Sequence, residues 1–203
     1  MAAQIIVIFS ERPVFCTPQE KHASMATPVI AFNQLANEFE GDGLTPAHAE
    51  KLAGELAKTF SVQMDEVAIM KLDKTQLVFM YPSKLGQVGS IPLNTSSSVA
   101  ARTATTKRAE AINNFAQTKH ASVFESVKLT DKKSNPAIPG VTKEEKHVIQ
   151  KMMTVPVVGP AGVQGVIQIS RKGTSAPAAG NDFSQMDLQK LVAIATALAK
   201  CFK

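Results

Sequence analysis

The order of strand-like and helix-like segments predicts an α+β fold with an antiparallel sheet. Two pairs of strand-like runs are each joined by a short reversal, and such tight connections link antiparallel neighbours. Amphipathic helices precede the first pair and follow the second. Of the 203 residues, 44% are hydrophobic and 19% are charged, which is enough apolar material for a core. This composition excludes a disordered, collagen-like or disulfide-scaffold class.

Two helices are predicted before the first strand. The first covers about residues 28–40, where Pro28 suits the first helical position and apolar residues recur at helical spacing. The second covers residues 45–61, with Thr45 as N-cap, one apolar face and one face of Glu and Lys. The short glycine-containing turn between them is typical of a helix-turn-helix, but the balance of acidic and basic residues argues against DNA binding.

The middle of the chain predicts a hairpin and then smaller elements. Strands are expected at 67–72 and 76–81, and a small helix from Val99 that is capped by the Ser/Thr cluster at 95–98. A short strand is expected at 109–112. Residues 116–141 are expected to be mostly loop, and the Thr142–Glu145 sequence predicts the capping box of a further short helix.

The C-terminal part predicts a second hairpin and a final helix. Strands at 154–158 and 165–171 flank a Gly-Pro-Ala-Gly reversal. The helix covers 184–202, with Ser184 as cap and Phe183 packed on Leu188 as a hydrophobic staple. Its predicted apolar face consists of Leu188, Leu191, Val192, Ala195, Leu198, Ala199 and Phe202.

The net charge and the cysteine positions limit the classes of partner and the cellular location that the sequence predicts. The net charge of +5 is too small and too scattered to predict a nucleic-acid partner. Cys16 and Cys201 lie near opposite ends of the chain, which suits a reducing compartment. No leader-like start or apolar run of about 20 residues occurs, so we expect a cytoplasmic protein that does not interact with membranes.

Several motifs resemble the GAF domain family. The segments 155–158 and 165–171, followed by Phe183 and the apolar helix from Leu191 to Ala199, are similar to the end of a GAF domain. Upstream, the segment 89–93 and the helix start at 98–101 resemble the family's loop-to-helix segment. The resemblance covers about residues 44–202. It suggests a free-standing GAF-like domain at 44–203, preceded by an N-terminal extension at 1–43 with one helix.

The resemblance implies an architecture and a set of partners. GAF domains have a twisted antiparallel sheet with helices on both faces. A ligand pocket lies on one face, and the terminal helices pack together on the other, often as a dimeric bundle. We therefore expect an unidentified small-molecule ligand and a homodimer through helices 45–61 and 184–202. A signalling protein acting in trans is a further candidate partner.

Cysteine positions bear on catalysis. Free methionine-R-sulfoxide reductases are catalytic GAF proteins, and they need thiols clustered at the pocket. This sequence has no Cys between residues 17 and 200. We therefore expect a protein that is not an enzyme, and the same gap argues against covalent bilin attachment.

The candidate ligand-binding residues lie between positions 113 and 125. Cyclic-nucleotide-binding GAF domains carry an Asn-Lys, Phe and Asp-Glu signature, which this segment matches only in part, because Asn114 precedes Phe115 and not Lys. The segment combines an apolar wall with a few polar groups, as small-molecule sites do. The predicted site residues are Asn113, Asn114, Phe115, His120, Phe124 and Glu125. Alternatively, the asparagines cap turns and the phenylalanines fill the core.

No metal site is predicted, because the four His residues are far apart and lack partners at ligand spacing. No cofactor is specified, and haem bound through one His stays open. The favoured function is a non-enzymatic sensor that binds a small molecule and signals through dimer or partner contacts. The alternatives are a dimerisation module without a ligand and a GAF-fold enzyme of unknown chemistry.

Overall fold

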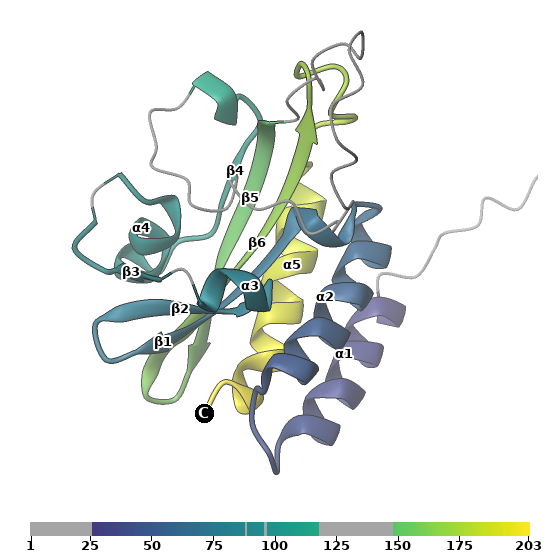
Figure 1. The fold of residues 1–203 in the computed structure, drawn as a ribbon. Helices are drawn as coiled ribbons and strands as arrows, with labels where there is room; N and C mark the ends of the chain where they lie inside the picture. Colours follow the sequence, from purple (N-terminus) through teal and green to yellow (C-terminus); the bar gives the residue numbers. More distant parts are fainter. Residues whose placement is uncertain (1–25, 88, 96, 118–147) are drawn as a thin grey trace, which may run out of the picture.

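The protein forms a six-stranded antiparallel sheet with helices on both faces (Figure 1). The structure is a computed structural model, and it describes residues 26–87, 89–95, 97–117 and 148–203. The strand order across the sheet is β3-β2-β1-β6-β5-β4. The strands are β1 (Val67–Asp73), β2 (Gln76–Tyr81), β3 (Ser90–Pro92), β4 (Glu110–Ile112), β5 (Val148–Gly159) and β6 (Gly162–Gly173).

The two predicted hairpins are confirmed. Asp73 pairs with Gln76 across the two-residue turn of the β1–β2 hairpin, and Gly159 pairs with Gly162 across that of β5–β6. Strands β5 and β6 have 12 residues each and are longer than expected. Their ends carry Lys, Gln and Arg side chains, so the apolar runs that predict a strand cover only their middle parts.

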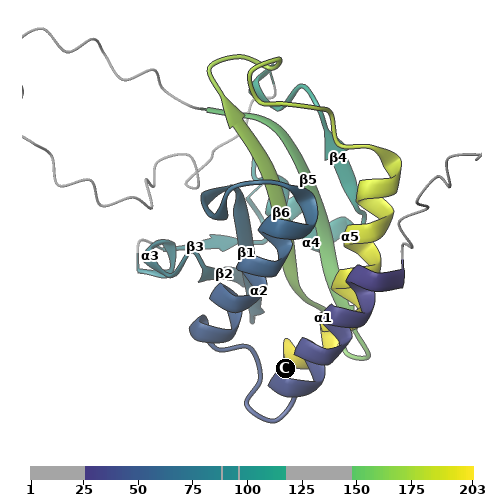
Figure 2. The same ribbon diagram turned by 90° about the vertical axis from the view of Figure 1, so that its right-hand side faces the viewer.

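One face of the sheet carries α1 (Ala26–Phe39), α2 (Pro46–Phe60) and α5 (Gln185–Leu198), as Figures 1 and 2 show. Helix α2 packs on β1 and β2, α5 packs on β5, and α1 packs mainly on α5. The largest apolar cluster of the chain fills the space between these three helices and the sheet. The expected packing of the terminal helices on one face is therefore confirmed, whereas the domain boundary at residue 43 stays a prediction.

The ends of α2 and α5 follow the predicted capping rules. The Thr45 side chain accepts a hydrogen bond from the His48 N–H at 3.2 Å. At α5, the Asp187 N–H donates to Ser184 Oγ, while the Ser184 N–H donates back to the Asp187 carboxylate. This reciprocal capping box satisfies two backbone donors at the start of the helix.

The apolar face of α5 differs from the prediction at two positions. Ile194, which was not expected on this face, is 0% exposed, whereas the predicted Val192 is 40% exposed. The buried direction is set by Leu188, Leu191 and Leu198, and at 100° per residue Ile194 lies nearer its centre than Val192 does. The prediction for Val192 is therefore wrong.

The opposite face carries α3 (Ser83–Gly86), α4 (Val99–Thr106) and the short 3-10 helix η2 (Phe115–Gln117). A second apolar cluster lies between these elements and the sheet. The predicted small helix from Val99 is confirmed, with Ser98 accepting a hydrogen bond from the Ala101 N–H at 3.2 Å. The predicted capping box at 142–145 lies outside the described residues. Among those described, no helix combines the length and apolar character that a membrane span requires.

Candidate functional site

A row of polar side chains crosses the sheet on the face that carries α4. Glu110 of β4 pairs with Thr154 of β5, which pairs with Gln168 of β6. Gln168 in turn pairs with Ala68 of β1. Residues opposite each other on neighbouring strands project from the same face. Glu110, Thr154 and Gln168 therefore form one transverse row, which we call the polar row.

The neighbouring rows on this face are largely apolar. On one side Pro156 pairs with Val166, which pairs with Met70. On the other side Ile112 pairs with Met152, which pairs with Ser170, a fully buried residue whose hydroxyl donates to the Glu66 carbonyl oxygen at 3.0 Å. The polar row therefore lies within a largely apolar surface, in which Ser170 bonds the backbone, and buried polar groups of this kind need specific partners.

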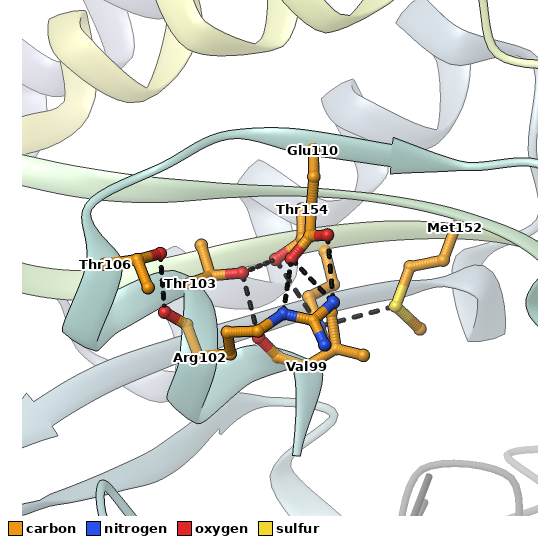
Figure 3. Close-up of polar contacts among 8 residues, drawn as sticks. Val99, Arg102, Thr103, Thr106, Glu110, Met152 and Thr154 are labelled. Atoms are coloured by element: carbon orange, nitrogen blue, oxygen red, sulfur yellow. Dashed lines mark hydrogen bonds and ion pairs between the residues drawn. The ribbon is translucent and has the colours of Figure 1, made fainter. Parts of the chain in front are cut away.

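Helix α4 supplies one of these partners (Figure 3). The hydroxyl oxygens of Thr103 and Thr154 are 3.1 Å apart, and Thr103 Oγ1 also lies 2.9 Å from the Val99 carbonyl oxygen. Because a carbonyl oxygen only accepts, Thr103 donates to Val99, and Thr154 donates to Thr103. The Gln168 amide donates to Thr154 Oγ1 at 3.5 Å and to Met152 Sδ at 3.4 Å. The direction of this chain of hydrogen bonds is thus fixed from β6 to α4.

An ion pair joins α4 to the end of the polar row. Arg102 Nε lies 3.1 Å from Glu110 Oε1, and Arg102 Nη2 lies 2.9 Å from both carboxylate oxygens. The side chains are 45% and 32% exposed, so the pair stands at the rim of the covered region. Its two-oxygen geometry fixes the orientation of α4 relative to β4 more tightly than a single contact would.

The two inner residues of the polar row are closely covered, with Thr154 0% and Gln168 6% exposed. Thr103 of α4, which contacts Thr154, is also 0% exposed. Besides Val99, the apolar residues that α4 buries here are alanines. The site therefore combines two hydroxyls, one carboxamide and one charge of each sign beneath a short helix with small side chains. Such a set of donors and acceptors suits a polar organic molecule rather than a hydrocarbon.

The structure separates the predicted site residues. The Asn113 side chain bonds the backbone of Phe183, with Nδ2 3.1 Å from the Phe183 oxygen and Oδ1 3.0 Å from its nitrogen. Phe115 is buried in the apolar cluster of the α4 face. Asn114 is exposed, and its carbonyl accepts a hydrogen bond from the Gln117 N–H.

Phe115 thus fills the core, whereas the Asn113 side chain bonds a backbone segment 70 residues further along the chain. His120, Phe124 and Glu125 lie outside the described residues.

The polar row was not predicted from the sequence. Its signal in the sequence is a polar residue inside the apolar run of each strand, Thr154 in β5 and Gln168 in β6, together with the interrupted basic segment that contains Arg102. Only the strand register brings these positions together. The pairing of Arg102 with Glu110 was likewise not predicted.

Other reactive groups lie away from this row. Cys201 is fully buried, and burial raises the pKa of its thiol. Burial likewise raises the pKa of Tyr81. Within the described ranges, no three His, Cys, Asp or Glu residues are grouped as metal ligands would be.

A surface groove lies on the helical face, between α1 and α2. Its volume is about 250 Å³, and it is lined by Ala31, Gln34, Leu35, Glu38, Lys51 and Glu55. Lys51 is paired with Glu38 at 2.8 Å, and Lys58 with Glu55 at 2.7 Å. The charges around this groove are therefore already neutralised by their neighbours.

Solved structures resemble this chain over most of its length. The GAF domain of a phosphoenolpyruvate-protein phosphotransferase from Coxiella burnetii matches with a TM-score of 0.57 and 10% identity, over 88% of this chain and 94% of that one. The corresponding domain from Acinetobacter matches with a TM-score of 0.55 and 14% identity, over 86% and 92%. No protein-family model matches the sequence, and a search of curated proteins gives no match.

A third match corrects the prediction about catalysis. The fRMsr protein of Staphylococcus aureus, a methionine sulfoxide reductase, matches in its complex with substrate with a TM-score of 0.52 and 15% identity. The match covers 86% of this chain and 95% of that one. The prediction that the chain is not an enzyme is contradicted, because the same fold carries a reductase. Cysteine spacing addresses thiol chemistry alone, and one fold can host many chemistries. The sheet order, the two helical layers and these matches together show that the chain has the GAF domain fold.

Proposed function

We propose that this chain is a GAF-type sensor or regulatory domain that binds a polar small molecule at the polar row. The observation that supports the proposal is the buried hydrogen-bond chain from Gln168 through Thr154 to Thr103, with the Arg102–Glu110 ion pair at its rim. A core built for stability alone could hold apolar residues at these positions, since replacing both partners of a buried hydrogen bond by apolar groups can be nearly neutral or stabilising.

The proposed ligand carries hydrogen-bonding groups and at least one charge. A ligand that enters beside α4 would replace the Thr103–Thr154 contact with its own hydrogen bonds. Arg102 and Glu110 stand at the rim, where they offer one positive and one negative partner. A molecule that carries a carboxylate or phosphate together with donor groups fits this pattern. As a further part of the proposal, His120, Phe124 and Glu125 take part in binding the same ligand.

Signal output is proposed to pass through the helical face, by way of a homodimer or a partner protein. The exposed residues of α5 are all uncharged, whereas the charged Asp187 and Lys190 are half-buried; the exposed residues are Gln185, Met186, Gln189, Val192, Ala193 and Thr196. Ile30 of α1 is also exposed, at 56%. Exposed apolar residues on an uncharged helix face favour association.

Helix α2 fits this role less well than the sequence indicates. Its apolar stripe is buried inside the chain, and its outward side carries Glu50, Lys51 and Lys58. The proposed dimer surface therefore consists of α1 and α5. A dimerisation module without a ligand is the second candidate function, and the same surface supports it. We also propose a cytoplasmic location, which the two cysteines far apart in the sequence support.

Thermal unfolding against a library of nucleotides, amino acids and organic acids tests ligand binding. A ligand at 100 times its Kd should stabilise the native state by about 2.7 kcal/mol, because it binds that state alone. The stabilisation should be lost in Gln168→Leu and kept in Glu38→Gln, which alters an ion pair on the helical face. Unchanged melting temperatures with every compound would contradict the sensor proposal and favour the dimerisation module.

A further inference from the structure

Asn113 attaches the end of β4 to the start of α5. It follows the last residue of β4 directly, and its side-chain amide bonds both backbone polar groups of Phe183, at 3.1 and 3.0 Å. Phe183 immediately precedes Ser184, the N-cap residue of α5. The side chain of Phe183 is buried in the apolar cluster of the helical face. The Asn113 side chain therefore fixes the position of the backbone that enters the first turn of α5.

The other end of β4 is attached to α4. Glu110, the first residue of β4, accepts three hydrogen bonds from Arg102. Strand β4 has only three residues and lies at the edge of the described sheet, where it pairs with β5 at residues 152–154. A short edge strand thus carries an attachment to each face of the sheet, one at each of its ends.

We propose that β4 and Asn113 couple α4 on one face of the sheet to the N-terminus of α5 on the other. This inference rests on the proposed function, since a ligand that enters beside α4 and binds Arg102 and Glu110 disturbs the pair between them. Breaking that pair frees the first residue of β4 from α4. The resulting movement of β4 shifts the backbone of Phe183, because Asn113 is bonded to it by two hydrogen bonds. Helix α5 belongs to the proposed dimer surface. The connection through β4 and Asn113 therefore couples ligand binding at the polar row to that surface.

Amide hydrogen exchange in the full chain, without any ligand, tests the coupling. The reporter is the Leu188 N–H, which bonds the Ser184 carbonyl at 3.1 Å in the first turn of α5. Glu110→Gln weakens the attachment to α4 and should raise the exchange rate of this amide about threefold or more. In an Asn113→Ala background, the same change at residue 110 should have almost no further effect at Leu188. Glu38→Gln, which weakens an ion pair between α1 and α2, is the matched control and should leave Leu188 unchanged.

Two results would overturn the inference. One is an equal increase at Leu188 in both backgrounds, which would show that residue 110 reaches α5 without Asn113. The other is faster exchange throughout α4 in Glu110→Gln with Leu188 unaffected. Should Asn113→Ala fail to fold, Asn113→Asp serves instead, because it keeps the acceptor for the Phe183 N–H and loses the donor to its carbonyl. The experiment needs no ligand, so its result is independent of the thermal screen of the proposed function.

Discussion

The hydroxyl oxygens of Thr103 and Thr154 lie 3.1 Å apart, and this contact joins α4 to the centre of the sheet. Thr154 donates to Thr103, and Gln168 donates to Thr154. Each hydroxyl is thus a necessary partner of the next group, inside a region that water does not reach. The contact has consequences that mutagenesis can measure.

Replacing either threonine by valine should destabilise the protein, by about 1–3 kcal/mol, because a buried polar group loses its partner. The double variant Thr103→Val, Thr154→Val should cost less than the sum of the two single changes, since the mutual contact is counted only once. Urea unfolding followed by circular dichroism gives the three free energies. Strictly additive costs would show that the two hydroxyls do not interact.

The direction in which α5 faces the core leads to a second prediction. Ile194→Ala should lower the free energy of unfolding by about 2–5 kcal/mol, because it leaves a cavity at a fully buried position. Val192→Ala should cost less than about 1 kcal/mol, since this side chain is 40% exposed. The comparison is made by urea unfolding at concentrations at which light scattering shows a monomer. Equal costs would mean that the helix is rotated from the described orientation.

The elements of this fold were largely predictable because their signals are local. Thr45 and Ser184 cap helices as expected, and the six buried residues of α2 are those of its apolar stripe. Helix α3 was missed because its four residues are too few to show a helical period. Val192 was assigned to the wrong face because helical periodicity in a sequence defines the edges of an apolar face only to within about one residue.

The site was less predictable because it depends on register. Thr154 and Gln168 are unremarkable polar residues in their own strands, and only strand pairing aligns them with Glu110. Asn113 was predicted as a ligand-binding residue, yet its side chain bonds a backbone segment 70 residues away. Sequence patterns show the residue types, whereas the neighbours across the sheet decide what those residues do.

The capping box of α5 predicts a dependence of stability on acid. Burial alone would raise the pKa of Asp187, but hydrogen bonds from the backbone and side chain of Ser184 hold it below the ordinary value of 3.8. The carboxylate therefore contributes stability that is complete above this ordinary pKa and is lost as the pH falls through the lowered native value. Asp187→Asn should be less stable than the wild type at neutral pH, with a difference that shrinks in acid.

Ser184→Ala is a companion variant for this prediction. It removes the cap as well as the hydroxyl donor, and it should cost about 1 kcal/mol at neutral pH. Unfolding free energies at neutral pH and in a series of acid buffers measure both effects. A difference between wild type and Asp187→Asn that grew in acid would contradict the assigned hydrogen bonds.

The uncharged surface of α5 predicts the effect of a charge on assembly. Val192→Glu places a carboxylate in the middle of the proposed interface and should shift a dimer towards monomer in light scattering. Lys58→Glu, on the charged outer side of α2, should leave the mass unchanged. A dimer that persists in Val192→Glu but dissociates in Lys58→Glu would place the interface on α2 instead of α5.

The most direct test of ligand binding at the polar row is an NMR titration with the compound that raises the melting temperature most. The backbone amide signals of Thr103, Thr154 and Gln168 should shift with a common Kd. Gln168→Leu should raise that Kd tenfold or more, because the ligand loses a hydrogen bond worth about 1.4 kcal/mol. Shifts confined to the groove between α1 and α2, with the signals of these three residues unchanged, would contradict the account.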